Sequence, residues 1–137
     1  MKEQGMLVVI SGPSGTGKGT VVKELVKKQQ FALSISATTR SLRPNEIDGV
    51  HYYFYSKEVF EKMKNENQLL EWAEFCGNYY GTPKKYVEQQ MAEGKNVILE
   101  IEVQGALQIK EIYNDCILVF MIPPSAKELK KILTERA

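Results

Sequence analysis

A glycine-rich segment at residues 12–20, Gly-Pro-Ser-Gly-Thr-Gly-Lys-Gly-Thr, carries the clearest chemistry in the sequence. It follows the apolar run Met6–Ile10 after a single residue, Ser11, and the residues after it favour a helix. A strand, a glycine loop and a helix in this order form a P-loop, whose backbone N–H groups and helix dipole hold phosphate. Lys18 adds a full positive charge. A nucleoside triphosphate is therefore expected on the whole loop, which comprises Gly12, Pro13, Ser14, Gly15, Thr16, Gly17, Lys18, Gly19 and Thr20.

A magnesium ion is expected beside this loop. Gly19 stands where a magnesium-binding hydroxyl is usual, and the hydroxyl follows one residue later at Thr20. Glu100 ends the apolar run Val97–Leu99, where an acidic residue can hold Mg²⁺ through water. The alternative for Glu100 is a solvated acid at a strand end. Together with the P-loop, Thr20 and Glu100 are the predicted metal-binding residues.

A polar segment at residues 38–49 offers a second anion site. Arg40 and Arg43 lie three residues apart, and two guanidinium groups suit a phosphate better than a single carboxylate. Tyr52, Tyr79 and Tyr80 could donate hydrogen bonds to the same phosphate. Loop arginines are usually solvated and aromatic residues at strand spacing usually pack in a core, so only the combination is informative.

The composition excludes several classes of protein. The 137 residues carry 18 basic and 17 acidic side chains, so no overall charge favours nucleic acid or an anionic membrane. Cys76 and Cys116 are far apart, which argues against a disulfide framework or a zinc site and fits a reducing compartment. The apolar run near the N-terminus is too short for a signal peptide or a membrane span. These features predict a cytoplasmic protein of one domain.

Short apolar strands alternate with helices along the chain. This order predicts an α/β fold, a three-layer P-loop core with a parallel sheet, interrupted by a small mixed α+β insertion. Thr82 is expected to cap the helix that Pro83 begins and Gly94 ends. The expected strands include residues 6–10, 31–36, 69–75, 96–101 and 117–122, and the expected helices include 18–28, 57–65, 83–94, 108–113 and a last one from 125.

Several motifs together resemble the guanylate kinase family. They are Ser-Ala-Thr-Thr-Arg-x-x-Arg at 36–43, Glu-x-Asp-Gly-x-x-Tyr-x-Phe at 46–54, Leu-Glu-Trp-Ala at 70–73, Gly-Asn-Tyr-Tyr-Gly-Thr at 77–82 and Glu-Ile-Glu-Val-Gln-Gly at 100–105. The resemblance spans the chain from the P-loop to Pro124. It implies an ATP-binding core of residues 1–35 and 83–137, a GMP-binding subdomain of residues 36–82, and a lid that begins near residue 136.

The resemblance also implies roles for individual residues. In the family's pattern the acceptor GMP, or dGMP, is bound by Ser36, Arg40, Arg43, Tyr52, Glu71, Tyr80, Thr82 and Glu102. In this pattern the GMP phosphate is bound by Ser36, by Arg40 and Arg43, and by Tyr52 and Tyr80. The guanine is bound by Glu71, Thr82 and Glu102. Guanine presents N1–H and an amino group to a carboxylate, and its O6 can accept from Thr82, whereas adenine would leave that carboxylate unpaired.

The implied reaction transfers the γ-phosphoryl group of ATP, with Mg²⁺, to GMP in purine nucleotide metabolism. The phosphate acceptor is already ionised, so catalysis rests on positioning and charge stabilisation rather than on a general base. The implied catalytic residues are Lys18, Arg40, Arg43 and Arg136.

Two departures from the family pattern qualify these expectations. Glu102 stands where aspartate is usual, and the chain ends at Ala137, directly after the first lid arginine. We therefore expect a fragment that binds GMP and phosphate but has greatly reduced turnover. The alternatives are a P-loop kinase of a phosphorylated sugar and a guanylate-kinase-like module that binds phosphopeptides. The choice between monomer and homodimer, and between GMP and dGMP, stays open.

Overall fold

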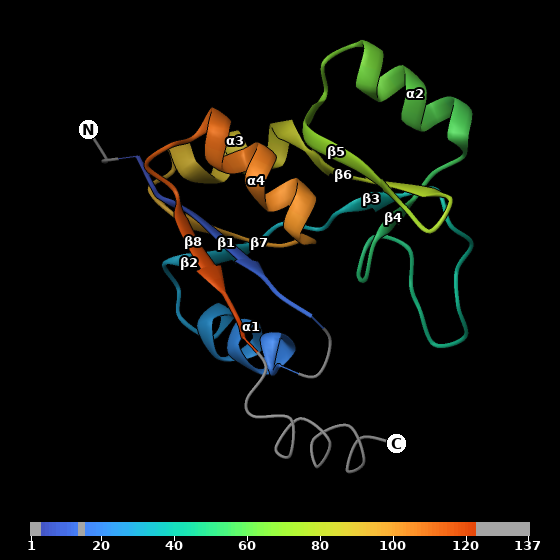
Figure 1. Ribbon diagram of the computed structural model, residues 1–137. Helices are drawn as coiled ribbons and strands as arrows, with labels where there is room; N and C mark the ends of the chain where they lie inside the picture. Colours follow the sequence, from blue (N-terminus) through green and yellow to red (C-terminus); the bar gives the residue numbers. More distant parts are fainter. Residues whose placement is uncertain (1–3, 14–15, 123–137) are drawn as a thin grey trace.

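A four-stranded parallel sheet forms the middle layer of the core (Figure 1). The computed structural model describes residues 4–13 and 16–122. The strands lie in the order β2-β7-β1-β8, which places the P-loop strand inside the sheet. Their bounds are β1 Leu7–Ser11, β2 Phe31–Leu33, β7 Asn96–Glu100 and β8 Ile117–Phe120.

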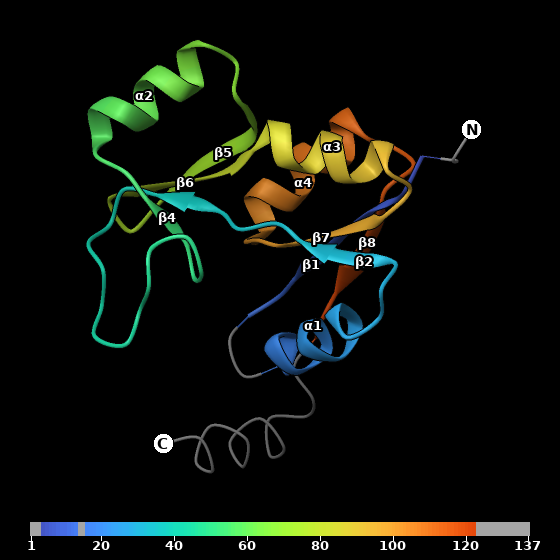
Figure 2. The same ribbon diagram turned by 180° about the vertical axis from the view of Figure 1, so that it is seen from behind.

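Helices cover both faces of this sheet. Helix α1 (Lys18–Val26) lies on one face, and α3 (Lys84–Ala92) and α4 (Val103–Ile112) lie on the other (Figures 1 and 2). Alternate residues of β1 serve the two layers, since Leu7 and Val9 pack in the cluster with α3 and α4. Val8 and Ile10 pack in the cluster with α1. A strand buried on both faces must be apolar at every position, which explains the continuous hydrophobic run and confirms the predicted three-layer α/β core.

A second, mixed sheet carries the insertion. Its order is β4-β3-β6-β5, with β3 parallel to β4 and the other pairs antiparallel. Helix α2 covers it, and Phe60 of α2 packs fully buried with Ala37 and Leu69. Ser56 caps this helix by accepting a hydrogen bond from the backbone N–H of Val59 at 3.2 Å. The bounds are β3 Ala37–Thr38, β4 Tyr53–Phe54, α2 Lys57–Asn65, β5 Leu69–Phe75 and β6 Asn78–Pro83.

The structure corrects several expected boundaries. Thr82 does not cap α3: it is the penultimate residue of β6, its hydroxyl is bonded to Glu71, and Pro83 takes the cap position without a side-chain hydrogen bond. The strand expected at 31–36 ends at Leu33. The helix expected to include residues 108–113 is α4, which already begins at Val103, because buried Ala106 and Ile109 extend its apolar face toward the sheet. Ser14, Gly15, Arg136 and the expected last helix lie outside the described residues.

No helix in the described ranges has the length and apolar character needed to cross a membrane.

Phe60 and Phe75 form a matched pair for testing what stabilises the insertion. Phe60 is fully buried and stacks on Tyr79 with ring centroids 5.6 Å apart, whereas Phe75 is 57% exposed. We expect Phe60→Ala to lower the free energy of unfolding by about 3 to 5 kcal/mol, because it leaves a cavity, and Phe75→Ala by less than about 1 kcal/mol. Urea unfolding followed by tryptophan fluorescence measures both. Equal effects would contradict the assignment of Phe60 as the centre of the insertion's core.

Candidate functional site

The P-loop leaves β1 and turns into α1 through two glycines with positive φ. Gly12 has φ 139°, and a Cβ there would collide with the carbonyl oxygen of Met121. Gly17 has φ 88° and occupies the cap position of α1. Lys18 folds back over the loop, where its Nζ donates to the carbonyl oxygen of Gly12 at 2.5 Å. The ammonium group therefore lies against the loop whose amides are the expected phosphate ligands.

Thr20 and Glu100 offer oxygen ligands on two elements next to the loop. Both are exposed, Thr20 in the first turn of α1 and Glu100 at the end of β7. Glu100 pairs in register with Ile10, one residue before β1 ends, so its carboxylate lies at the loop's edge of the sheet. No cluster of three or more possible metal ligands occurs among the described residues. One hydroxyl and one carboxylate fit Mg²⁺, which keeps most of its waters and shares substrate phosphates.

The Gly19 position is open, since a Cβ there would meet no atom within 4 Å. Space alone therefore does not require glycine at this point of the loop.

Arg40 is held in one orientation by a carboxylate and two aromatic rings. Its Nη1 and Nη2 each donate to one oxygen of Glu46 at 2.7 Å, and these side chains are 10% and 16% exposed. The guanidinium carbon lies 5.0 Å from the ring centroid of Tyr52 and 5.5 Å from that of Phe54. The hydrogen bond from Arg40 is the main reason that the pKa of Glu46 falls to about 2. The pair is thus ionised at neutral pH, and Arg40 is preorganised.

Two predicted phosphate ligands lie beside Arg40. The Tyr52 and Tyr80 rings meet edge to face at 6.0 Å, and burial, followed by the neighbouring Tyr80, raises the pKa of Tyr52. The Tyr52 hydroxyl therefore keeps its proton and can donate a hydrogen bond to a phosphate oxygen. Ser36 and Arg43 are less engaged: within the described ranges their side chains make no hydrogen bond, although the Arg43 backbone N–H donates to Glu46 at 2.7 Å. The structure thus brings together Arg40, Tyr52 and Tyr80.

Glu71 and Thr82 face each other between β5 and β6. Glu71 is 4% exposed and Thr82 is fully buried. The Thr82 hydroxyl donates to Oε1 of Glu71 at 2.6 Å, so its proton is committed to the carboxylate. Burial raises the pKa of Glu71 to about 7, the Thr82 hydrogen bond opposes this rise, and the charge of Glu102 adds to it.

Glu102 brings a second carboxylate to the same place. It occupies the N-cap position of α4, so it belongs to the core, whereas Glu71 belongs to the insertion. Oε2 of Glu71 and Oε1 of Glu102 are both buried and have no hydrogen-bond partner among the described residues. Buried polar atoms normally have partners, and two orphaned acceptors side by side are complementary to a ligand with two neighbouring donors.

Sequence reasoning gave no role to Glu46, Phe54 or Gln108. Glu46 lies in one of the quoted motifs, which was the available signal, but its pairing with Arg40 depends on the shape of the loop. Gln108 reaches from α4 to the insertion, where its Nε2 donates to the carbonyl oxygen of Trp72 at 2.8 Å.

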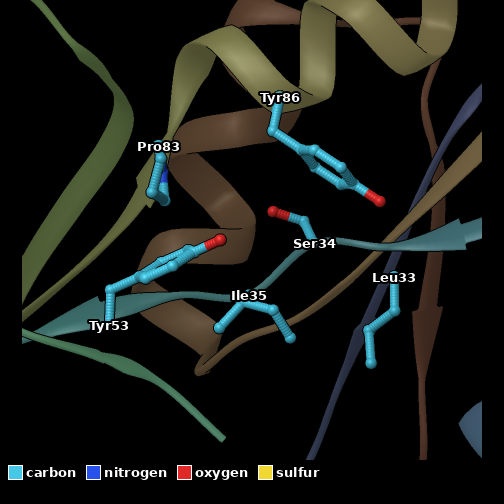
Figure 3. Close-up of a pocket in the computed structure, with 6 residues that line it drawn as sticks. All are labelled: Leu33, Ser34, Ile35, Tyr53, Pro83 and Tyr86. Carbon is cyan, nitrogen blue, oxygen red and sulfur yellow. The ribbon is translucent and has the colours of Figure 1, made fainter. Parts of the chain in front are cut away.

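A separate cavity of about 150 Å³ lies where the chain passes between the two sheets. Figure 3 shows the hydroxyl groups of two tyrosines and a serine around it. The cavity contains none of the predicted site residues, so we do not assign the chemistry to it. Its lining residues are Leu33, Ser34, Ile35, Tyr53, Pro83 and Tyr86.

The fold and these groups define a P-loop nucleotide-binding protein with a second anion site and a buried acidic pair. The sequence model described as guanylate kinase matches residues 4–137. The chain is 54% identical to a guanylate kinase of Desulfitobacterium hafniense over 98% of its own length and 68% of the relative's. It is 56% identical to that of Clostridium tetani, over 98% and 64% of the two lengths.

A solved structure agrees with these relatives. The crystal structure of guanylate kinase from Anaplasma phagocytophilum superposes with a TM-score of 0.80 at 32% identity, covering 96% of this chain and 66% of that one. This chain belongs to the guanylate kinase family, whose enzymes are ATP:GMP phosphotransferases. It spans about two thirds of the length of the relatives it matches.

The raised pKa of Glu71 predicts a pH-dependent stability. The pKa rises from the ordinary 4.5 to about 7, so the folded state holds this proton more tightly than the unfolded chain does. The resulting stabilisation is complete below about pH 4.5 and is lost as the pH rises through 7. Glu71→Gln should therefore gain about 2 to 3 kcal/mol relative to wild type between pH 5 and pH 8. Urea unfolding at both pH values tests this, and a difference independent of pH would contradict it.

Proposed function

We propose that this chain binds GMP at the second sheet and the phosphates of ATP at the P-loop, and transfers the γ-phosphoryl group between them. The observation that carries the proposal is the pair of orphaned acceptor oxygens on Glu71 and Glu102. Guanine offers N1–H and its 2-amino group as neighbouring donors, which match this pair. Adenine has an acceptor at N1 and would leave a buried carboxylate unpaired.

We assign the binding of the GMP phosphate to the side chains around Arg40. The Arg40 guanidinium is oriented by Glu46, and the protonated Tyr52 hydroxyl and Tyr80 lie beside it. Ser36 and Arg43 are assigned to the same phosphate by motif. A phosphate oxygen that is already ionised needs no general base, so these side chains bind and orient the nucleophile and offset its charge.

The donor is assigned to the P-loop. Lys18 and the loop amides would hold the ATP phosphates, with Thr20 and Glu100 holding Mg²⁺ through water. Bound with ATP, Mg²⁺ supplies positive charge to the β- and γ-phosphates. Arg136 is proposed to act from the lid on the transferring group.

These assignments divide the chain into a GMP-binding part and an ATP-binding part. We assign residues 36–82 to the GMP-binding subdomain and residues 1–35 and 83–137 to the ATP-binding core, with Glu102 contributed by the core to the guanine site, and we expect the protein in the cytoplasm, where both nucleotides are available. A kinase of sugar phosphates would have no use for the paired acceptors of Glu71 and Glu102. A phosphopeptide module would have no use for the P-loop with Lys18.

Two substitutions separate the two nucleotide sites. Lys18→Ala should reduce the affinity for a non-hydrolysable ATP analogue by about tenfold or more while leaving GMP affinity within about twofold, because only the P-loop loses charge. Glu71→Ala should show the reverse pattern. Calorimetric titration of both nucleotides, with AMP and a sugar phosphate as controls, measures these effects. The proposal fails if wild type binds AMP or the sugar phosphate as tightly as GMP.

Arg40 and Arg43 give a matched test of the phosphate site. Arg40→Lys keeps the charge but loses the two-pronged contact with Glu46 and the stacking on Tyr52, so GMP affinity should fall by about tenfold or more. Arg43→Lys changes an exposed side chain and should cost less than about threefold. Guanosine, which lacks the phosphate, serves as the control ligand. If Arg40→Lys weakens guanosine as much as GMP, the residue does not act on the phosphate.

A further inference from the structure

The first turn of α4 passes directly beneath the two orphaned carboxylate oxygens, and Gly105 is the residue at the point of contact. We propose that Gly105 is a positioning residue for guanine recognition, and that it acts through the absence of a side chain. The inference rests on the proposed function of the Glu71 and Glu102 pair as the guanine-reading group.

The distances single out this position. A Cβ on Gly105 would lie 2.7 Å from Oε2 of Glu71 and 2.8 Å from Oε1 of Glu102, with Cδ of Glu71 at 3.2 Å. The two oxygens at closest range are the same two that lack partners. A methyl group at position 105 would therefore occupy the space next to both acceptor oxygens, which glycine leaves free.

No backbone requirement explains the glycine. Gly105 lies within α4 and is absent from the positive-φ glycines of the described residues, so any L-amino acid could adopt its conformation. Glycine is also the poorest helix former after proline, and alanine would favour the helix. The contact with the two carboxylates is thus the remaining physical reason for glycine here.

The consequences of adding a side chain differ for the two carboxylates. Glu71 is buried and bonded to Thr82, so it resists displacement. Glu102 is only partly buried at the helix cap, and no side-chain hydrogen bond among the described residues holds its carboxylate, so we expect it to move more readily than Glu71. A methyl group at position 105 should therefore separate the two acceptors by moving Glu102. One of guanine's two neighbouring donors would then lose its partner.

Comparing GMP with inosine monophosphate tests for this separation, because inosine monophosphate retains N1–H but lacks the 2-amino group. We expect Gly105→Ala to weaken GMP binding by about tenfold or more and to weaken inosine monophosphate binding much less. The ratio of the two affinities should fall accordingly. A merely structural defect would weaken both ligands together and leave that ratio unchanged.

The experiment measures the affinities of GMP and inosine monophosphate by calorimetry for the whole chain and four variants. These are Gly105→Ala, Glu102→Ala, the double variant, and Leu107→Ala as a control on an exposed position of the same helix. In the Glu102→Ala background, Gly105→Ala should cause little further loss of selectivity, because the carboxylate it displaces is gone. Leu107→Ala should leave the ratio within about twofold of wild type.

The outcomes separate this inference from the proposed function. If wild type fails to prefer GMP over inosine monophosphate, the proposed function of the acidic pair fails. If wild type shows the preference and Gly105→Ala keeps the same ratio within about twofold, the role of Gly105 is overturned. Thermal unfolding monitors the fold. If Gly105→Ala does not fold, adding Glu102→Ala should restore folding, because it removes the carboxylate that the new methyl group contacts. A double variant that also fails to fold would show that this contact is not the cause, and would overturn the proposal.

Discussion

The burial of a carboxylate between the second sheet and helix α4 is the constraint on which much of this molecule depends. Glu71 is 4% exposed and keeps one oxygen bonded to Thr82, while the other has no partner in the described part of the chain. A buried acid in this state is costly, and its raised pKa expresses that cost. The surrounding elements serve to hold the group in place: β6 supplies Thr82, α4 supplies Glu102, and β5 enters the core cluster through Leu70.

The group around Arg40 differs from the acidic pair, because its charge is neutralised by a partner within the protein. Arg40 is stabilised by its ion pair with Glu46, so the polar segment at residues 38–49 holds a paired charge at this point rather than an exposed cation. The ring stacking with Tyr52 and Phe54 orients the guanidinium plane without consuming its hydrogen-bond donors. An unsatisfied carboxylate on β5 and an ion-paired arginine just after β3 are thus both carried by the insertion. The two arrangements match a ligand that is neutral with donors at one end and anionic at the other.

Much of this architecture could be predicted from local patterns. The doubly buried strands are continuous apolar runs, and the P-loop is a contiguous motif whose glycines have local conformational reasons. Thr82 was misplaced because its local capping preference lost to a tertiary partner eleven positions away in sequence, Glu71. The apolar pattern indicates only the part of α4 from residue 108, because Glu102, Gln104 and Gly105 interrupt it before that point. Gly105 could not be interpreted from sequence, since its contacts come from residues that only the folded chain brings together.

The hydrogen bond between Gln108 and Trp72 has a mechanical consequence. Glu71 lies between Leu70, which packs in the core cluster, and Trp72, whose carbonyl group is held by α4. The buried carboxylate of Glu71 is therefore tethered to the core through both neighbouring residues. Arg40 instead lies on a segment joined to the core by the short connection at residues 34–36. A bound nucleoside monophosphate with its base at Glu71 and its phosphate at Arg40 would therefore connect the tethered strand β5 to the loop that carries Arg40, at a separation set by the length of the ligand.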